Sequence, residues 1–242
     1  MRRSWAWWVI AAAFVAGCAP QPPRAPDVAA PVAAGAAPAD FPAQRYRAAR
    51  ARGQPIFAID PARSIVVVEV RRAGSLARLG HDHVVASHDV RGFVAPNDGE
   101  ADLYVPLAGM TVDDPPLRAE AGFDTVPTEA DIADTRRNML TRVLDVERYP
   151  FAQVSFRHAS PAAADDVGDV AISLHGVTHI VRLPLRIESR ADEIVVSGTV
   201  ALKQSDYGIA PLSILGGAIQ VADEVTLRFR LVARPCAPQS CA

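Results

Sequence analysis

Four segments in the second half of the chain decide its fold: YPFAQVSF (149–156), ISLHGVTHIVRLPLRI (172–187), VSGTVALKQSDYGI (196–209) and VADEVTLRFRL (221–231). In the last of them, every second residue from Val225 to Leu231 is apolar and the residues between are polar. An extended strand with this pattern has one apolar face and one wet face. None of the segments contains a nucleophile–base pair or a phosphate-binding loop. We therefore expect a β container whose function lies in its cavity.

The same alternation occurs in the first half of the chain. Residues 64–70 place Val66, Val68 and Val70 on one face and Val67 and Glu69 on the other. Turn residues separate the short runs, which is typical of an antiparallel barrel or sandwich. Further strands are expected at 83–87, 90–95, 101–108, 151–158, 168–175, 178–188, 193–203 and 223–233.

One helical segment interrupts the strands at 128–145. Thr128 and Asp131 have the spacing of a capping box. Apolar residues then recur at helical intervals, from Ile132 through Met139 to Val143. Two roles remain open for this helix: it gates the mouth of a barrel, or it plugs one end for stability.

The first 17 residues predict a secretory signal peptide. Arg2 and Arg3 precede a short apolar run that ends in Val-Ala-Gly-Cys (15–18), which resembles the bacterial lipobox. In lipoproteins of this kind the signal is removed before the cysteine, here Cys18, and acyl chains on that cysteine anchor the protein. Ala19 after the cysteine resembles the pattern for sorting to the outer membrane. An ordinary secretory signal is the alternative.

The rest of the chain divides into three parts. Residues 18–54 are rich in proline and alanine and predict an extended, disordered tether. Residues 55–234 predict the barrel domain, and residues 235–242 a short tail. Within the tail, Cys236 and Cys241 are suited to a terminal disulfide in an exported protein, with free thiols or a metal site as alternatives.

The charge of the chain argues against one class of partner. The formal net charge is −2 and the sequence pI is about 6.3, without a cluster of basic residues. A protein that binds nucleic acid usually carries a basic patch. We therefore predict no nucleic-acid partner. Nothing in the sequence predicts an oligomeric state.

The order and spacing of six segments resemble the YceI-like family of polyisoprenoid-binding proteins. They are FAIDPARSIVVVEV (57–70), GFV (92–94), MLTRVLDVERYPFAQVSF (139–156), ISLHGVTHIVRLPLRI (172–187), LKQSDYGI (202–209) and VADEVTLRFRL (221–231). The resemblance implies a mainly β fold: an extended, antiparallel, lipocalin-like barrel of about eight strands with the helical insertion. It also implies a ligand, an isoprenoid chain such as the tail of a quinone or its precursor.

An interior of about eight strands has room for one slim ligand or for a filled core. Apolar side chains on the inward faces attract an alkyl chain by burying its surface. The residues expected to line the cavity are Val68, Val70, Phe93, Phe156, Leu174, Leu183, Leu185, Val225, Leu227 and Phe229.

Two pairs of histidines depart from a plain lipid-binding pattern. His81 and His83 lie at i and i+2, so that an extended strand points both to one side. His175 and His179 flank the turn at Gly176–Thr178. Each pair predicts either a metal site, a polar clamp for a ligand head group, or solvated surface histidines.

Two functions follow from these features. The first is a lipid-anchored envelope protein that binds or carries isoprenoid or quinone-like lipid, with no certain cofactor other than that lipid. The alternative is a metal-dependent redox accessory protein or enzyme that uses the histidine pairs. Serines such as Ser205 lack the G-x-S-x-G elbow of a hydrolase, so we predict a protein that is not an enzyme.

Overall fold

The computed structural model describes residues 36–157 and 167–236. The predicted signal peptide (1–17) and Cys18 lie outside these residues. Among the described helices, none is long and apolar enough to cross a membrane.

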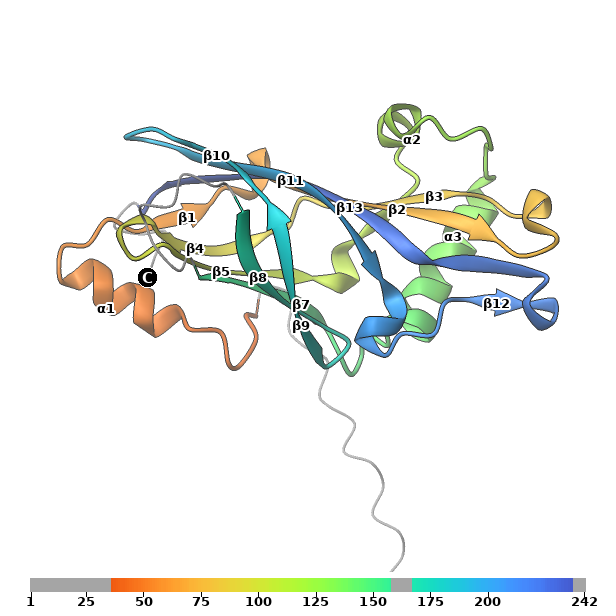
Figure 1. Cartoon of the computed structure of the whole chain (residues 1–242), viewed down its shortest axis with the longest axis horizontal. Coiled ribbons are helices and arrows are strands. Elements are labelled where there is room, and N and C mark those ends of the chain that lie inside the picture. The colour runs from red at the N-terminus through yellow and green to blue at the C-terminus, as the bar shows by residue number, and fades with distance from the viewer. Residues whose placement is uncertain (1–35, 158–166, 237–242) are drawn as a thin grey trace, which may run out of the picture.

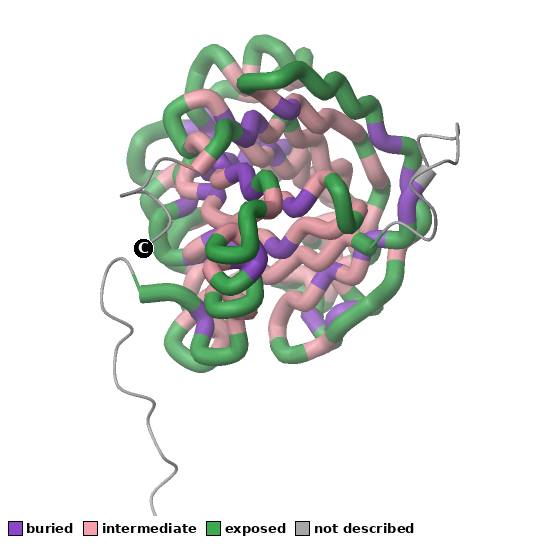
Figure 2. The backbone as a smooth tube through the Cα atoms, turned by 90° about the vertical axis from the view of Figure 1, so that its left-hand side faces the viewer, coloured by how far each residue is buried: buried purple, intermediate pink, exposed green. Residues whose placement is uncertain are grey.

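The protein is built on a 13-stranded antiparallel sheet that curls around the long axis of the molecule (Figures 1 and 2). The predicted strands are present, with small shifts at their ends. The strands are β1 (Phe57–Ile59), β2 (Ile65–Ala73), β3 (His83–Ser87), β4 (Arg91–Ala95), β5 (Glu100–Pro106), β6 (Thr111–Val112), β7 (Phe151–Arg157), β8 (Val167–Leu174), β9 (Val177–Pro184), β10 (Arg186–Ser189), β11 (Ile194–Lys203), β12 (Ser213–Ile214) and β13 (Ile219–Pro235).

The longest strand, β13, holds the sheet together. It pairs with β1 and β2 along one edge and with β11 and β12 along the other. From β1 the sheet continues through β4, β5, β7 and β8 to β9, and from β2 it continues through β3 to β6.

The sheet is mainly antiparallel as predicted, but it is not closed and it has more than eight strands. The predicted strand at 178–188 is broken into β9 and β10 at Pro184–Leu185. Pro184 has no N–H to donate to a neighbouring strand. As a result β9 pairs with β8, while β10 pairs with β11, so the ladder of hydrogen bonds stops at β9.

A tight turn joins β8 to β9 at His175 and Gly176. Both residues have positive φ, 53° and 79°, and Leu174 pairs directly with Val177. This is the geometry of a two-residue type I′ hairpin, whose twist matches that of the strands. The predicted turn at Gly176–Thr178 therefore lies one residue earlier, at His175–Gly176.

The helical insertion is confirmed at α3 (Glu129–Asn138), and Thr128 and Asp131 form the predicted capping box. The helix continues as a π-helical turn, η5 (Met139–Val143). A second helix, α2 (Pro115–Ala121), lies in a part of the chain where no helix was predicted. Proline is well suited to the first turn of a helix because its missing N–H has no helical partner to lose. α2 covers Val67, Val84 and Ala86 on the outer face of the sheet.

The prediction of a disordered tether at residues 18–54 is wrong for the last part of that range. Residues Ala43–Ala51 form a helix, α1, at the opposite end of the long axis from α2 and α3 (Figure 1). Tyr46 and Ala49 of α1 are buried against Ile56 and Ala95. The folded domain therefore begins before residue 55, with α1 packed on the outer face of the sheet.

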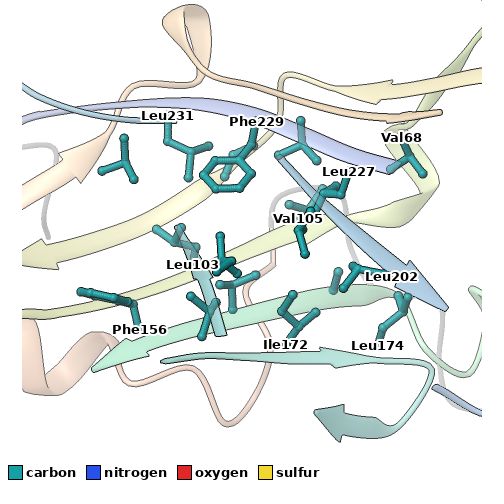
Figure 3. A pocket seen from close by; sticks show the side chains of 18 of the residues that line it. Val68, Leu103, Val105, Phe156, Ile172, Leu174, Leu202, Leu227, Phe229 and Leu231 are labelled. Carbon is teal, nitrogen blue, oxygen red and sulfur yellow. The ribbon is translucent and has the colours of Figure 1, made fainter. Parts of the chain in front are cut away.

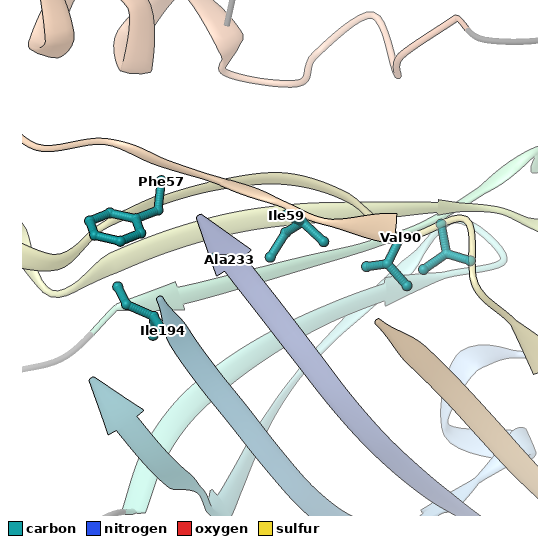
Figure 4. Close-up of a cluster of buried hydrophobic side chains, with 6 residues drawn as sticks. Phe57, Ile59, Val90, Ile194 and Ala233 are labelled. Atoms are coloured by element: carbon teal, nitrogen blue, oxygen red, sulfur yellow. The ribbon is translucent and has the colours of Figure 1, made fainter. Parts of the chain in front are cut away.

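Short 3₁₀ turns complete the described chain: η1 (Pro61–Arg63), η2 (Ala77–Leu79), η3 (Pro96–Asp98), η4 (Leu107–Gly109), η6 (Gln204–Tyr207) and η7 (Leu215–Gly217). A compact cluster of Phe57, Ile59, Val90, Val105, Ile194 and Ala233 fills the interior near β1 (Figure 4). All of them except Phe57 also border the cavity described next, so this cluster forms its floor.

Candidate functional site: an apolar cavity

A cavity of about 710 Å³ runs inside the curled sheet. Its walls are almost entirely apolar side chains from the inward faces of the strands, with contributions from η5 (Figure 3). Cavities that bind small molecules have volumes of roughly 300–1,000 Å³ and mostly apolar walls. The interior is thus hollow enough to hold a ligand and is not a filled core.

The structure places nine of the ten expected lining residues at the cavity: Val68, Val70, Phe156, Leu174, Leu183, Leu185, Val225, Leu227 and Phe229. Several of them are seen in Figure 3, where they project from facing strands toward a common interior. The period of two along each strand was the signal that identified them.

Phe93 is the exception, and its placement in the lining is wrong. Its ring packs against Tyr46 of α1 at a centroid distance of 5.3 Å and against Phe41 at 6.1 Å. The next residue, Val94, faces the cavity instead. Because α1 covers this part of the sheet, the outer face is apolar too, and an aromatic residue there gives no indication of which way it points.

Two glycines make room for the two lining phenylalanines. A Cβ atom on Gly168 would lie 2.1 Å from Cε2 of Phe156, and one on Gly198 would lie 2.7 Å from Cζ of Phe229. Real carbon atoms do not approach so closely. Each phenyl ring therefore occupies space beside a glycine that a larger side chain at that position would fill.

Residues of the helical insertion also form part of the wall. Met139, Val143 and Leu144 line the cavity, and Ile132 packs with Met139 against Met110 and Val112. The helix predicted to lie at a barrel mouth therefore contributes side chains to the ligand space. Leu103 and Val154, which face each other on β5 and β7, are lining residues that the sequence interpretation did not single out.

Polar groups reach the cavity mainly near η6, where Lys203, Gln204 and Tyr207 border it. Tyr207 is almost fully buried. Its hydroxyl has no hydrogen-bond partner among the described residues. Burial, followed by the nearby Asp206 carboxylate, raises the pKa of Tyr207. The tyrosine therefore stays neutral at ordinary pH.

The second histidine pair does not form a common site. His175 lies in the hairpin turn, with its ring 4.5 Å from that of Tyr149. His179 lies on β9, with its ring 5.3 Å from that of Tyr207. Each imidazole thus packs against a different tyrosine.

The first histidine pair is close together. The rings of His81 and His83 are 6.1 Å apart. His83 Nδ1 lies 2.6 Å from Oδ2 of Asp113, whose side chain is 0% exposed. Oδ1 of Asp113 accepts hydrogen bonds from the Val84 amide (3.0 Å) and from Arg118 (2.5 Å). Burial opposes ionisation of Asp113, but the hydrogen bonds from His83, Val84 and Arg118 outweigh it and lower its pKa.

Asp113 is a site residue that the sequence interpretation missed. It lies just before Asp114 and two prolines, and it has a left-handed backbone with φ of 58°. No group of three or more His, Cys, Asp or Glu side chains in the described part of the chain is arranged to hold a metal ion. The metal-dependent alternative therefore has no support from these residues.

Cys236 is disulfide-bonded. Its predicted partner, Cys241, lies outside the described residues.

An open-ended, curled antiparallel sheet around an apolar cavity defines a container for apolar ligands. A family model described as "YceI-like domain" matches residues 57–233, and the chain belongs to this family. No curated protein matches the sequence.

Two solved structures are similar to the chain, and the first of them, with the higher TM-score, shares its fold. A polyisoprenoid binding domain from Saccharophagus degradans, implicated in plant cell wall breakdown, has 14% sequence identity and a TM-score of 0.52, and the match covers 74% of this chain and 98% of that one. BcnA from Burkholderia cenocepacia has 16% identity and a TM-score of 0.49, with 72% and 98% covered.

Proposed function

We propose that the protein binds the apolar tail of an isoprenoid or quinone-like lipid in its cavity and acts as a carrier or buffer at the cell envelope. The cavity itself is the observation that carries this proposal: about 710 Å³ of space with apolar walls on all the strands that surround it. The family assignment and the polyisoprenoid-binding neighbour support it. Binding, and not catalysis, is the activity that this family assignment favours.

Burial of surface supplies the affinity. Apolar surface removed from water contributes roughly 25 cal/mol per Å², so about 300 Å² of prenyl tail contributes about 7 kcal/mol before the cost of ordering the chain. Phe156 of β7 and Phe229 of β13 both line the wall, together with many aliphatic side chains. Such a wall contacts an alkyl chain along its length but provides few polar groups that would distinguish one tail from another.

The proposed location rests on the N-terminal sequence. An acylated Cys18 would anchor the protein, and the proline-rich segment after it would act as a spacer on the periplasmic face of the outer membrane. A container for apolar cargo is useful there because its cargo resides in the membrane.

Native mass spectrometry of the gently purified protein tests the proposal. We expect an adduct with the mass of a prenyl lipid, and uptake of an added prenyl quinone by protein freed of its lipid. The protein would also show increased thermal stability on binding, because a ligand that binds only the folded state stabilises it. Repeated absence of both adduct and uptake would refute the proposal.

A further inference from the structure

His83 lies on β3 next to the valines that line the cavity, and the ring of His81 is 6.1 Å from that of His83; neither histidine is itself among the lining residues. On β3, Val85 pairs with Val68, and the next inward position, His83, pairs with Val70. The three valines all line the cavity. Alternate residues of a strand face the same side, so His83 continues the row that Val85 begins. His83 is 13% exposed, and α3 lies beside it, since Thr135 Oγ1 is 3.5 Å from His83 Nε2.

Asp113 determines which nitrogen of His83 carries the proton. Its carboxylate can only accept hydrogen bonds, so Nδ1 of His83, at 2.6 Å, is the donor. In the neutral ring the other nitrogen, Nε2, is then an acceptor. Among the described residues, its one neighbour with a proton to donate is Thr135, at the outer limit of hydrogen-bond distance. Nε2 of His83 is therefore a hydrogen-bond acceptor with a fixed orientation and only one distant donor among the described residues.

The surrounding network keeps this arrangement rigid. Arg118 binds Oδ1 of Asp113, the carbonyl oxygen of Asp82 (2.6 Å) and Thr125. Its side chain is 11% exposed, and its contacts are already made within the protein. It is therefore not available to neutralise a charged ligand.

Charge around the two imidazoles disfavours an anionic group. The buried carboxylate of Asp113 faces His83, and the Asp131 carboxylate of α3 lies 3.9 Å from Nε2 of His81. A phosphate placed between the rings would meet both carboxylates. His81 also has a buried nitrogen, Nδ1, with no partner among the described residues, and a buried polar atom of this kind is costly unless a ligand or water completes it.

We infer that His81 and His83 form the head-group site of the container, and that Nε2 of His83 accepts a hydrogen bond from a ligand hydroxyl, as in a polyprenyl alcohol or a prenylated phenol. The inference rests on the proposed function, because the tail in the cavity brings the hydroxyl to the end where the two histidines lie. Asp113 is a positioning residue, since it acts through His83.

Two probes with the same tail measure the effect: geranylgeraniol and its methyl ether. Both bury the same apolar surface, but only the alcohol can donate a hydrogen bond. The alcohol makes one hydrogen bond that the ether cannot make, so we expect wild-type protein to bind the alcohol about tenfold more tightly than the ether. His83→Phe keeps an aromatic ring and should reduce this ratio to about one without weakening binding of the ether. His179→Phe, which removes a histidine from the other pair, should leave the ratio unchanged.

A second variant tests the role of Asp113. In Asp113→Asn, the Val84 amide and Arg118 both donate to the position of Oδ1, so the amide oxygen stays there and the NH₂ group faces His83. That group donates to Nδ1, and the proton of His83 moves to Nε2, which can no longer accept from the ligand. The ratio should again fall to about one. Nitrogen-15 NMR of the ring should show the proton on Nδ1 in wild type and on Nε2 in the variant.

The outcomes separate the inference from the proposed function. If neither probe binds wild-type protein, the proposed function fails. If both probes bind wild type with equal affinity, or if His83→Phe keeps the preference for the alcohol, the cavity function stands and the head-group site is refuted. His83→Phe decides the question alone if Asp113→Asn does not fold.

Discussion

Replacing Asp102 with alanine is expected to lower the free energy of unfolding by about 3 kcal/mol and to release α1 from the sheet. Asp102 lies on β5 and is 3% exposed. Its carboxylate accepts hydrogen bonds from Tyr46 (2.8 Å), Arg45 (2.5 Å), Ser155 (2.6 Å) and Arg157 (2.8 Å). Two of these four partners belong to α1, so one carboxylate fixes the helix to the outer face.

The size of the loss in stability depends on how well the former partners of Asp102 are solvated once its carboxylate is removed. Breaking a buried ion pair costs about 3–5 kcal/mol when a charge stays buried without a partner. Here the two arginines are 41% and 42% exposed, so water can solvate them and the loss lies at the low end of that range. The hydroxyl of Tyr46 stays buried, and an unsatisfied buried donor costs about 1–3 kcal/mol. For a domain of this size, 3 kcal/mol corresponds to a decrease in Tm of roughly 6–12 °C.

The effect should depend on pH in one direction. Burial opposes ionisation of Asp102, but the hydrogen bonds from Ser155, Tyr46 and Arg157 outweigh it and lower its pKa in the folded protein. A carboxyl group whose folded pKa is lowered stabilises the protein above the unfolded value, about 3.9, and loses that contribution as the pH falls through the folded value. The difference between wild type and Asp102→Ala should therefore be constant near neutral pH and shrink below about pH 4.

Chemical denaturation at several pH values measures this difference, and hydrogen exchange of residues 43–51 reports on α1. Glu100→Gln is the matched control, because Glu100 also pairs with Arg45 and Arg157 but is partly exposed. It should cost less than about 1 kcal/mol. An Asp102→Ala protein with wild-type stability and unchanged exchange in α1 would contradict the expectation.

Alternation of apolar residues made most of the sheet predictable. From Val225 to Leu231 it gives both the strand and the face that points inward, because β13 has a cavity on one side and solvent or polar groups on the other. At Phe93 the same reasoning fails, since α1 covers the outer face and makes it apolar as well. A face can be assigned from sequence only where the two environments differ.

Contacts between distant residues were not predictable in this way. Asp102 and Arg45 are 57 positions apart, and neither residue differs in sequence pattern from an ordinary surface charge. The same holds for Asp113, whose bond to His83 depends on α2 and on the left-handed backbone before it. The H-x-H spacing identified His81 and His83 as unusual, but only the fold shows that Asp113 and α3 surround them.

Placing a tryptophan at Ala152 is expected to reduce the affinity for a prenyl lipid by at least tenfold while leaving the fold stable. Ala152 lies on β7 and faces the cavity, near where two clusters of core residues meet. An indole ring there occupies space that the lipid tail would fill. Forcing extra volume into an occupied site costs about 1–3 kcal/mol, and 1.4 kcal/mol corresponds to a tenfold change in affinity.

The stability of the variant distinguishes a hollow interior from a packed one. In a filled core the tryptophan would force neighbours such as Val154 aside and lower Tm together with affinity. In a cavity of about 710 Å³ the ring gains contacts without displacing the wall, so Tm of the lipid-free protein should be unchanged or higher.

Gln153→Trp is the matched control, because Gln153 is the next residue on β7 and faces outward, where it donates to Asp40 at 3.2 Å. A titration with a prenyl quinone should show weak binding to Ala152→Trp and wild-type binding to Gln153→Trp. Equal affinity in the two variants would mean that the lipid does not occupy this cavity.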